Sequence, residues 1–234
     1  TAVALDVARA NGMRLHAHCV DCSAAALGEV SNRFPQVAPV ACDAIALPYP
    51  SRSFDLVVSQ FGIEYAGEAA FTEASRLVCN GGALTAIVHS TDSALHRECA
   101  ENHAATRAVI EAKLMISARR AFGAGFDLIS GKVSPTDFQE HDRRLAAAVE
   151  AAKRIFRDRR ASALSAFVTV LLRDMGHMYN RIRNYTPAKV LAWLDAMEGE
   201  LVAYEGRMAS MTQCALDEAA IERIARSLSR AGFI

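Results

Sequence analysis

The sequence predicts an α/β fold: a parallel sheet with helices on both faces, and an all-α insertion after its last predicted strand. Short apolar runs alternate with helical periods up to about residue 90, an order typical of parallel sheets. From Ser90 to about Asp217 the pattern is helical, without a convincing strand. We therefore expect a core domain at 1–90, a helical insertion at 91–215 and a returning core helix at 216–234.

Local signals place the elements of the core domain. We expect helices at 1–10, 24–34 and 69–78, and strands at 14–20, 37–42, 54–59 and 83–88. The three helices end at Asn11-Gly12, at Pro35 and at Asn80-Gly81-Gly82. The runs Phe54 to Ser59 and Ala83 to Val88 read as strands without alternation, which predicts that both their faces are buried.

The helical insertion has its own start and stop signals. A helical period begins at Ser93 and reaches Phe122, with Gly123 and Gly125 as its stop, and Ser134-Pro135 starts the next helix. The later boundaries are a possible break around Asp158 to Ala161, an end near Tyr185, a start at Thr186-Pro187, an end near Met211, and a last helix from Asp217 through Arg230. We expect the insertion to pack as a lid over the carboxyl ends of the strands, where the chain leaves the sheet. Its methionines either fill the core or line an apolar substrate chamber.

Composition excludes several classes of partner. Lys plus Arg and Asp plus Glu are 26 each, and a net charge of zero disfavours nucleic acid as a partner. The uncharged run Ala161 to Leu172 is too short to span a membrane. No signal peptide is visible, and six cysteines fit a reducing compartment, so we expect a cytoplasmic protein.

Two acids stand at predicted strand ends. Asp21 and Asp43 each follow a strand, and in open parallel sheets the ligand crevice lies at the carboxyl ends of the strands. A carboxylate there can accept strong hydrogen bonds from ribose hydroxyls or an adenine amine. The alternative for Asp21 is a helix N-cap, because a predicted helix begins shortly after it.

These acids belong to a longer series of motifs. The series consists of Val20 to Ser23, Cys42 to Ala44 followed by Leu47 to Pro50, the strand Phe54 to Ser59, and the turn Leu77 to Gly82 with Asn80 in a proline place. In this order the motifs resemble the second half of the class I S-adenosylmethionine-dependent methyltransferase fold, which is Rossmann-like. The Gly-rich first motif and the last two strands of that family are absent from the sequence, so the resemblance covers residues 1–90 and the last helix.

The resemblance implies a cofactor and its site. It implies S-adenosyl-L-methionine as the cofactor, with Asp21 on the ribose and Asp43 and Ala44 beside the adenine. The implied cofactor-binding residues are Asp21, Cys22, Asp43, Ala44, Ser59, Gln60 and Phe61. It also makes Ala83 to Val88 strand five of the fold, so that the helical insertion follows strand five.

His89 is the candidate general base. It ends strand five at the same crevice, and an imidazole can take a proton from a hydroxyl or amine near neutral pH. Tyr65, just past strand four, is expected near it as a second catalytic residue, and Glu64, Tyr65 and His89 are the expected substrate contacts. The alternatives are a polar surface residue for His89 and a cap of the next helix for Glu64 and Tyr65.

No metal site is expected. His16, His18, Cys19 and Cys22 have ligand-like spacing, but they lie along one predicted strand whose side chains alternate between faces. The remaining cysteines, Cys42, Cys79, Cys99 and Cys214, are interpreted as small apolar fillers.

The predicted function is methyl transfer from S-adenosyl-L-methionine to a small-molecule acceptor. One alternative is a non-catalytic relative that forms a homodimer through its helical segment. A weaker alternative is a nicotinamide-dependent oxidoreductase, which shares the strand-end acid but fits the Leu47 to Pro50 turn and the Asn80 to Gly82 turn poorly.

Overall fold

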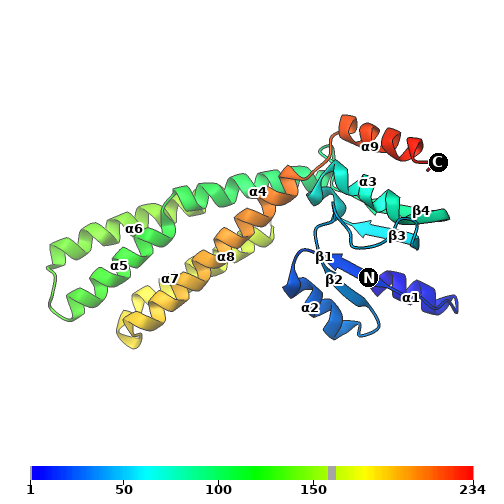
Figure 1. The fold of residues 1–234 in the computed structure, drawn as a ribbon. Coiled ribbons are helices and arrows are strands. Elements are labelled where there is room, and N and C mark those ends of the chain that lie inside the picture. The colour runs from blue at the N-terminus through cyan, green and yellow to red at the C-terminus, as the bar shows by residue number, and fades with distance from the viewer. Residues whose placement is uncertain (1, 158–161, 234) are drawn as a thin grey trace. The chain divides into compact units, whose positions relative to one another are not determined.

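The computed structural model describes residues 2–157 and 162–233 and divides the chain into two compact units. The strand unit comprises residues 1–93 and 214–234, and the helical unit comprises residues 94–213 (Figure 1). These boundaries lie a few residues from those expected at 90/91 and 215/216. The placement of the helical unit as a lid over the strands stays a prediction.

The strand unit is a mixed α/β structure with parallel strands. Its elements are α1 (Ala2–Ala10), β1 (His18–Asp21), α2 (Ala24–Arg33), β2 (Ala38–Ala41), β3 (Phe54–Gln60), the 3-10 helix η1 (Ile63–Ala66), α3 (Glu68–Leu77), β4 (Val78–Ile87) and α9 (Glu218–Arg230). The α/β class predicted from the sequence is therefore confirmed in this coarse form.

The strands form two parallel pairs rather than one sheet. β1 pairs with β2, and β3 pairs with β4 (Figure 1). In a doubly wound sheet the first strand of the fold lies between the second and the fourth. The described residues contain no strand ahead of α1, so the pairs that correspond to strands two and three and to strands four and five do not join.

The prediction that both faces of β3 and β4 are buried is wrong. Val57 and Leu84 pack against a core cluster built mainly from α3 and α9. On alternating positions, Leu56, Val58 and Ile87 are 50%, 55% and 52% exposed. Among the described residues helices therefore cover one face of this pair, and the other face is left apolar and open.

The Asn80-Gly81-Gly82 turn lies inside a strand. β4 begins at Val78, directly after α3, and its register with β3 shifts between Phe54 and Leu56. A Cβ on Gly82 would lie 2.7 Å from the carbonyl oxygen of Asp55, so only glycine fits this close approach. The glycines thus permit strand pairing, whereas the sequence pattern indicated a helix cap.

The helical unit has its own set of elements. They are α4 (Ala94–Glu111), α5 (Leu114–Ile129), α6 (Pro135–Phe156), α7 (Ala163–Asn180), the 3-10 helix η2 (Ile182–Asn184) and α8 (Pro187–Gln213). Capping confirms the start expected at Ser134-Pro135, because Ser134 and Asp137 form a reciprocal capping box. The break expected around 158–161 lies outside the described residues.

The single helix expected from Ser93 to Phe122 is in fact two. Lys113 has a left-handed φ of 58°, which ends α4 and starts α5. α5 then continues past Gly123 and Gly125, the expected stop. A Cβ on Gly125 would lie 2.7 Å from Ile182, so this glycine serves close packing and not helix termination.

The core of the helical unit is apolar. Phe122, Leu171 and Leu194 are each at most 1% exposed within one cluster, and Met175 is 2% exposed in the same cluster, which favours the packing role for this methionine. None of the helices in the described ranges is both long enough and apolar enough to cross a membrane.

Candidate active site

The first group of predicted site residues lies at the carboxyl ends of β1 and β2. Asp21 pairs with Ala41 in register, and the amide of Cys42 donates to the carbonyl of Asp21 at 3.2 Å. The strands thereby bring Asp21 and Asp43 to neighbouring strand ends, and both side chains are exposed.

Asp21 is not the N-cap of α2. Ser23 fills that role, because its Oγ accepts from the amide of Ala26 at 3.2 Å. One oxygen of Asp21 accepts the amide of Ser23 at 2.7 Å, and one oxygen of Asp43 accepts the amide of Ile45 at 3.1 Å. Each carboxylate thus shapes its own turn with one oxygen while its exposed side chain remains accessible to ligand hydroxyl or amine groups.

Cys22 and Ala44 complete this group. Cys22 is exposed beside Asp21, and Ala44 is half-buried and packs against the core cluster that contains Ile63. The neighbouring thiol of Cys42 has a raised pKa, first because of burial and second because of the charge of Asp43. That thiol therefore stays protonated near neutral pH and is a poor nucleophile.

The turn Leu47 to Pro50 is held by two residues that the sequence analysis missed. Glu73 accepts the amide of Leu47 at 2.8 Å, and Arg76 donates to the carbonyl of Tyr49 at 3.0 Å. The hydrogen bond from Arg76 holds the pKa of the Glu73 carboxyl below its usual value. Both come from α3, so this helix fixes the loop that follows Asp43.

The second group lies where β3 ends. The hydroxyl of Ser59, which is half-buried, accepts the amide of Ile63 at 3.0 Å, and Gln60 pairs with Ile87. The next residue, Phe61, has a φ of 52° and donates its amide to Ile87 at 2.8 Å. A left-handed conformation is unfavourable for a bulky side chain, and such strain is concentrated at functional sites.

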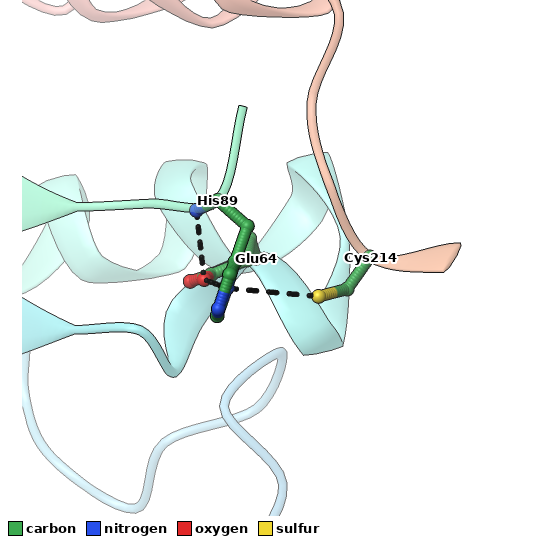
Figure 2. A group of neighbouring side chains, drawn as sticks. All are labelled: Glu64, His89 and Cys214. Carbon is green, nitrogen blue, oxygen red and sulfur yellow. Dashed lines mark hydrogen bonds and ion pairs between the residues drawn. The ribbon is translucent and has the colours of Figure 1, made fainter. Parts of the chain in front are cut away.

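Glu64 and His89 form a buried pair (Figure 2). The distance from Glu64 Oε1 to His89 Nδ1 is 2.6 Å, and the same oxygen accepts the backbone amide of His89 at 3.2 Å. The two residues are 3% and 4% exposed. The alternatives of a helix cap for Glu64 and a surface residue for His89 are therefore wrong, because Glu64 turns inward from η1 and reaches the chain just after β4.

Two aromatic rings flank the imidazole. The ring centroid of His89 lies 4.7 Å from that of Phe61 and 5.9 Å from that of Tyr65, the latter at 90°. Phe61 and Tyr65 are 40% and 47% exposed, whereas His89 is buried. The structure thus brings the two predicted catalytic residues together, with one oriented imidazole between two partly exposed rings.

Cys214 is a neighbour of this pair that the sequence analysis did not predict. The amide of Leu216 donates to the carbonyl of His89 at 2.8 Å, and the amide of Thr91 donates to the carbonyl of Leu216 at 3.1 Å. This backbone pairing places Cys214 Sγ 3.9 Å from His89 Nδ1 (Figure 2). No local pattern signals the contact, since the two residues lie on segments far apart in the sequence.

The His16 to Cys22 segment makes a different kind of contact. His18 Nδ1 lies 3.1 Å from the hydroxyl of Tyr49, and its ring packs edge-on against Tyr49 and Phe54. In the part of the chain that the structure describes, the group with metal-ligand geometry is Glu64, His89 and Cys214, and it includes no residue of that segment.

Comparison with known proteins adds the family. A sequence profile described as "Methyltransferase domain" matches residues 2–86. A comparison with curated proteins gives no match. The matched region holds both strand-end acids and the end of β3 with Glu64, while His89 and Cys214 lie beyond it. With its motif order and parallel strands, the region formed by residues 2–86 is therefore similar to a methyltransferase domain.

Proposed function

We propose that the protein transfers the methyl group of S-adenosyl-L-methionine to a small-molecule acceptor that binds beside His89. The observation that carries this proposal is the buried Glu64–His89 pair, next to the end of β4 and just past a domain of the methyltransferase family. In this proposal the carboxyl ends of the two parallel strand pairs together form the ligand crevice.

The cofactor would bind at the carboxyl ends of the strands. Asp21 and Cys22 hold the ribose, and Asp43 and Ala44 flank the adenine. The methionine part lies toward the end of β3, along Ser59, Gln60 and Phe61. The exposed carboxylates at the ends of β1 and β2 support this arrangement, because charged acceptors make the stronger hydrogen bonds to hydroxyl and amine donors.

The acceptor would bind beside the imidazole of His89. Glu64 holds the proton of the neutral imidazole on Nδ1, which leaves the lone pair of Nε2 to accept a proton. Nε2 of His89 would accept the proton of the acceptor hydroxyl or amine, and the bound cofactor would supply the electrophilic methyl group and leave as its demethylated form. The electrophile belongs to the cofactor, so the protein has to align the groups and exclude water. Tyr65 orients the acceptor from the side of the imidazole.

A small acceptor fits the charge of the protein. Lys plus Arg equals Asp plus Glu, 26 each, so no general excess of positive charge favours a nucleic-acid acceptor. The two partly exposed rings beside His89 offer apolar contact area for a compact molecule.

The test is methyl transfer from S-adenosyl-L-methionine that carries a labelled methyl group. The protein is incubated with the low-molecular-weight fraction of a cell extract and, separately, with the macromolecular fraction. Label in the small-molecule fraction supports the proposal, and label confined to macromolecules contradicts the acceptor class.

His89→Asn tests the base directly. Its side-chain amide can still donate to Glu64, but it has no nitrogen at the Nε2 position. We expect turnover to fall about 10²-fold with unchanged cofactor affinity, the typical value of general-base catalysis. Tyr65→Phe keeps the ring and measures separately what the hydroxyl of Tyr65 contributes to turnover. Full turnover in His89→Asn would remove the base assignment and leave a mechanism of proximity alone.

A further inference from the structure

We propose that Glu64, His89 and Cys214 form a binding site for one Zn²⁺ ion. One oxygen, one ring nitrogen and one sulfur of these side chains all lie within 4.8 Å of one another. The three residues come from different segments. Glu64 belongs to η1, His89 is the second residue after β4, and Cys214 lies in the chain that leads into α9 (Figure 2). Backbone hydrogen bonds from Leu216 to His89 and from Thr91 to Leu216 hold two of these segments together before any ion binds.

An unsatisfied oxygen points to a missing ligand. Glu64 Oε1 receives both hydrogen bonds from His89, whereas Oε2 is buried and finds no hydrogen-bond partner among the described residues. A buried carboxylate oxygen without a partner is unfavourable, because its desolvation is not compensated by a hydrogen bond. A cation bound by this carboxylate together with the imidazole and the thiolate would offset the buried charge that this carboxylate carries.

The distances are close to those of a tetrahedral zinc site. Zinc bonds of about 2.0–2.2 Å to nitrogen and oxygen and about 2.3 Å to sulfur place ligand atoms about 3.3–3.5 Å apart. Nδ1 to Sγ is 3.9 Å and must shorten by about 0.4 Å. Oε1 to Nδ1 is 2.6 Å and must lengthen by about 0.7 Å, because a metal ion replaces the proton between them.

The types of ligand atom favour zinc over magnesium or calcium. Imidazole, thiolate and carboxylate are its usual ligands, whereas Mg²⁺ and Ca²⁺ require oxygen ligands. A carboxylate and a thiolate together balance the two charges of the ion, so the loaded site buries no net charge. Binding releases the thiol proton to solvent and moves the imidazole proton to Nε2. Three protein ligands leave a fourth position for water or a substrate atom.

Zinc and the proposed base function exclude each other. In the loaded protein Nε2 carries the proton and cannot accept one, so we expect Zn²⁺ to inhibit methyl transfer reversibly. Zinc binding itself does not depend on methyl transfer, and it is measured without cofactor or acceptor.

The experiment is a metal titration of the full chain after removal of metal by a chelator. Calorimetry with Zn²⁺ should show one ion per chain, and Co²⁺ should give the visible bands of a tetrahedral ion with thiolate-to-cobalt charge transfer. Cys214→Ser should remove the charge-transfer band, and Glu64→Gln should weaken zinc binding about tenfold or more. The double variant Cys19→Ser/Cys22→Ser is the control and should leave both signals unchanged.

The outcomes separate this proposal from the proposed function. Absence of stoichiometric binding, an unchanged cobalt spectrum in Cys214→Ser, or loss of binding in the Cys19/Cys22 control would overturn the zinc site. An inactive His89→Asn together with no zinc binding leaves the base role standing alone. Zinc binding together with a fully active His89→Asn supports the metal site and removes the base.

Discussion

The helical unit and the strand unit bury different kinds of side chain. In the helical unit Phe122, Leu171 and Leu194 lie in one apolar cluster, and the buried hydroxyl of Thr106 bonds a carbonyl one turn away in its own helix. The strand unit instead buries Glu64 against His89, two residues from different segments.

This difference separates residues needed for folding from residues that indicate function. Apolar packing stabilises the helical unit directly, since burying apolar area is the main favourable contribution to folding. A buried carboxylate–imidazole pair stabilises little, because desolvation of the two groups offsets their attraction. Its presence beside a strained Phe61 supports the proposal that the pair acts in binding or chemistry.

The largest effect is expected in the core of the helical unit. Phe122 is 1% exposed and packs edge-on against Tyr179, with ring centroids 5.1 Å apart. Phe122→Ala should lower the free energy of unfolding by about 3–5 kcal/mol, measured by denaturant titration followed by circular dichroism. Val202→Ala, at a side chain that is 56% exposed, is the control. A loss no larger than that of the control would show that this core is not what stabilises the helical unit.

The next effect concerns cofactor affinity at the strand ends. Asp21→Ala should weaken S-adenosyl-L-methionine binding by about 1.5–3 kcal/mol, the value of hydrogen bonds to a charged group. This corresponds to a rise of Kd of about 10-fold to 150-fold in calorimetry. Asp55→Ala, at the amino end of β3, should leave Kd unchanged. Unchanged affinity in Asp21→Ala with lower thermal stability would reduce Asp21 to the residue that shapes the turn before Ser23.

The smallest effect on stability is expected from replacing the whole buried pair. Glu64→Met alone removes the acceptor of two hydrogen bonds from His89 and should lower the free energy of unfolding by about 1–3 kcal/mol. Glu64→Met combined with His89→Leu should bring it back to within about 1 kcal/mol of the unchanged protein, since apolar replacement of a buried pair is often neutral. The double variant should nonetheless lack methyl transfer. A double variant less stable than Glu64→Met would mean that the pair is a folding element after all.

Sequence patterns predicted best those features that depend only on residues close together in the chain, such as helix starts and strand ends. The start of α6 at Ser134-Pro135 and of α9 after Asp217 follows from side chains that cap the next amides, as the structure shows. The strand-end positions of Asp21 and Asp43 followed from the same local order. These features need no knowledge of the rest of the fold.

Features that depend on distant segments were missed. The open face of β3, with Leu56 and Val58 exposed, depends on which elements are present to cover it. The anchoring of the Leu47 to Pro50 turn by α3 and the approach of Cys214 to His89 join segments that no local pattern connects. The break between α4 and α5 lies at Lys113, whose backbone is left-handed. A lysine gives no sequence signal for this conformation, whereas a glycine would have done so.

Binding of S-adenosylhomocysteine to the full chain tests the central claim most directly. The demethylated cofactor should bind in calorimetry at one site per chain and raise the melting temperature, because a ligand at about 100 times its Kd stabilises the folded state by about 2.7 kcal/mol. NAD at the same concentration should leave the melting temperature unchanged. Stabilisation by NAD without any effect of S-adenosylhomocysteine would contradict the assignment of the strand ends to a methyl-donor cofactor.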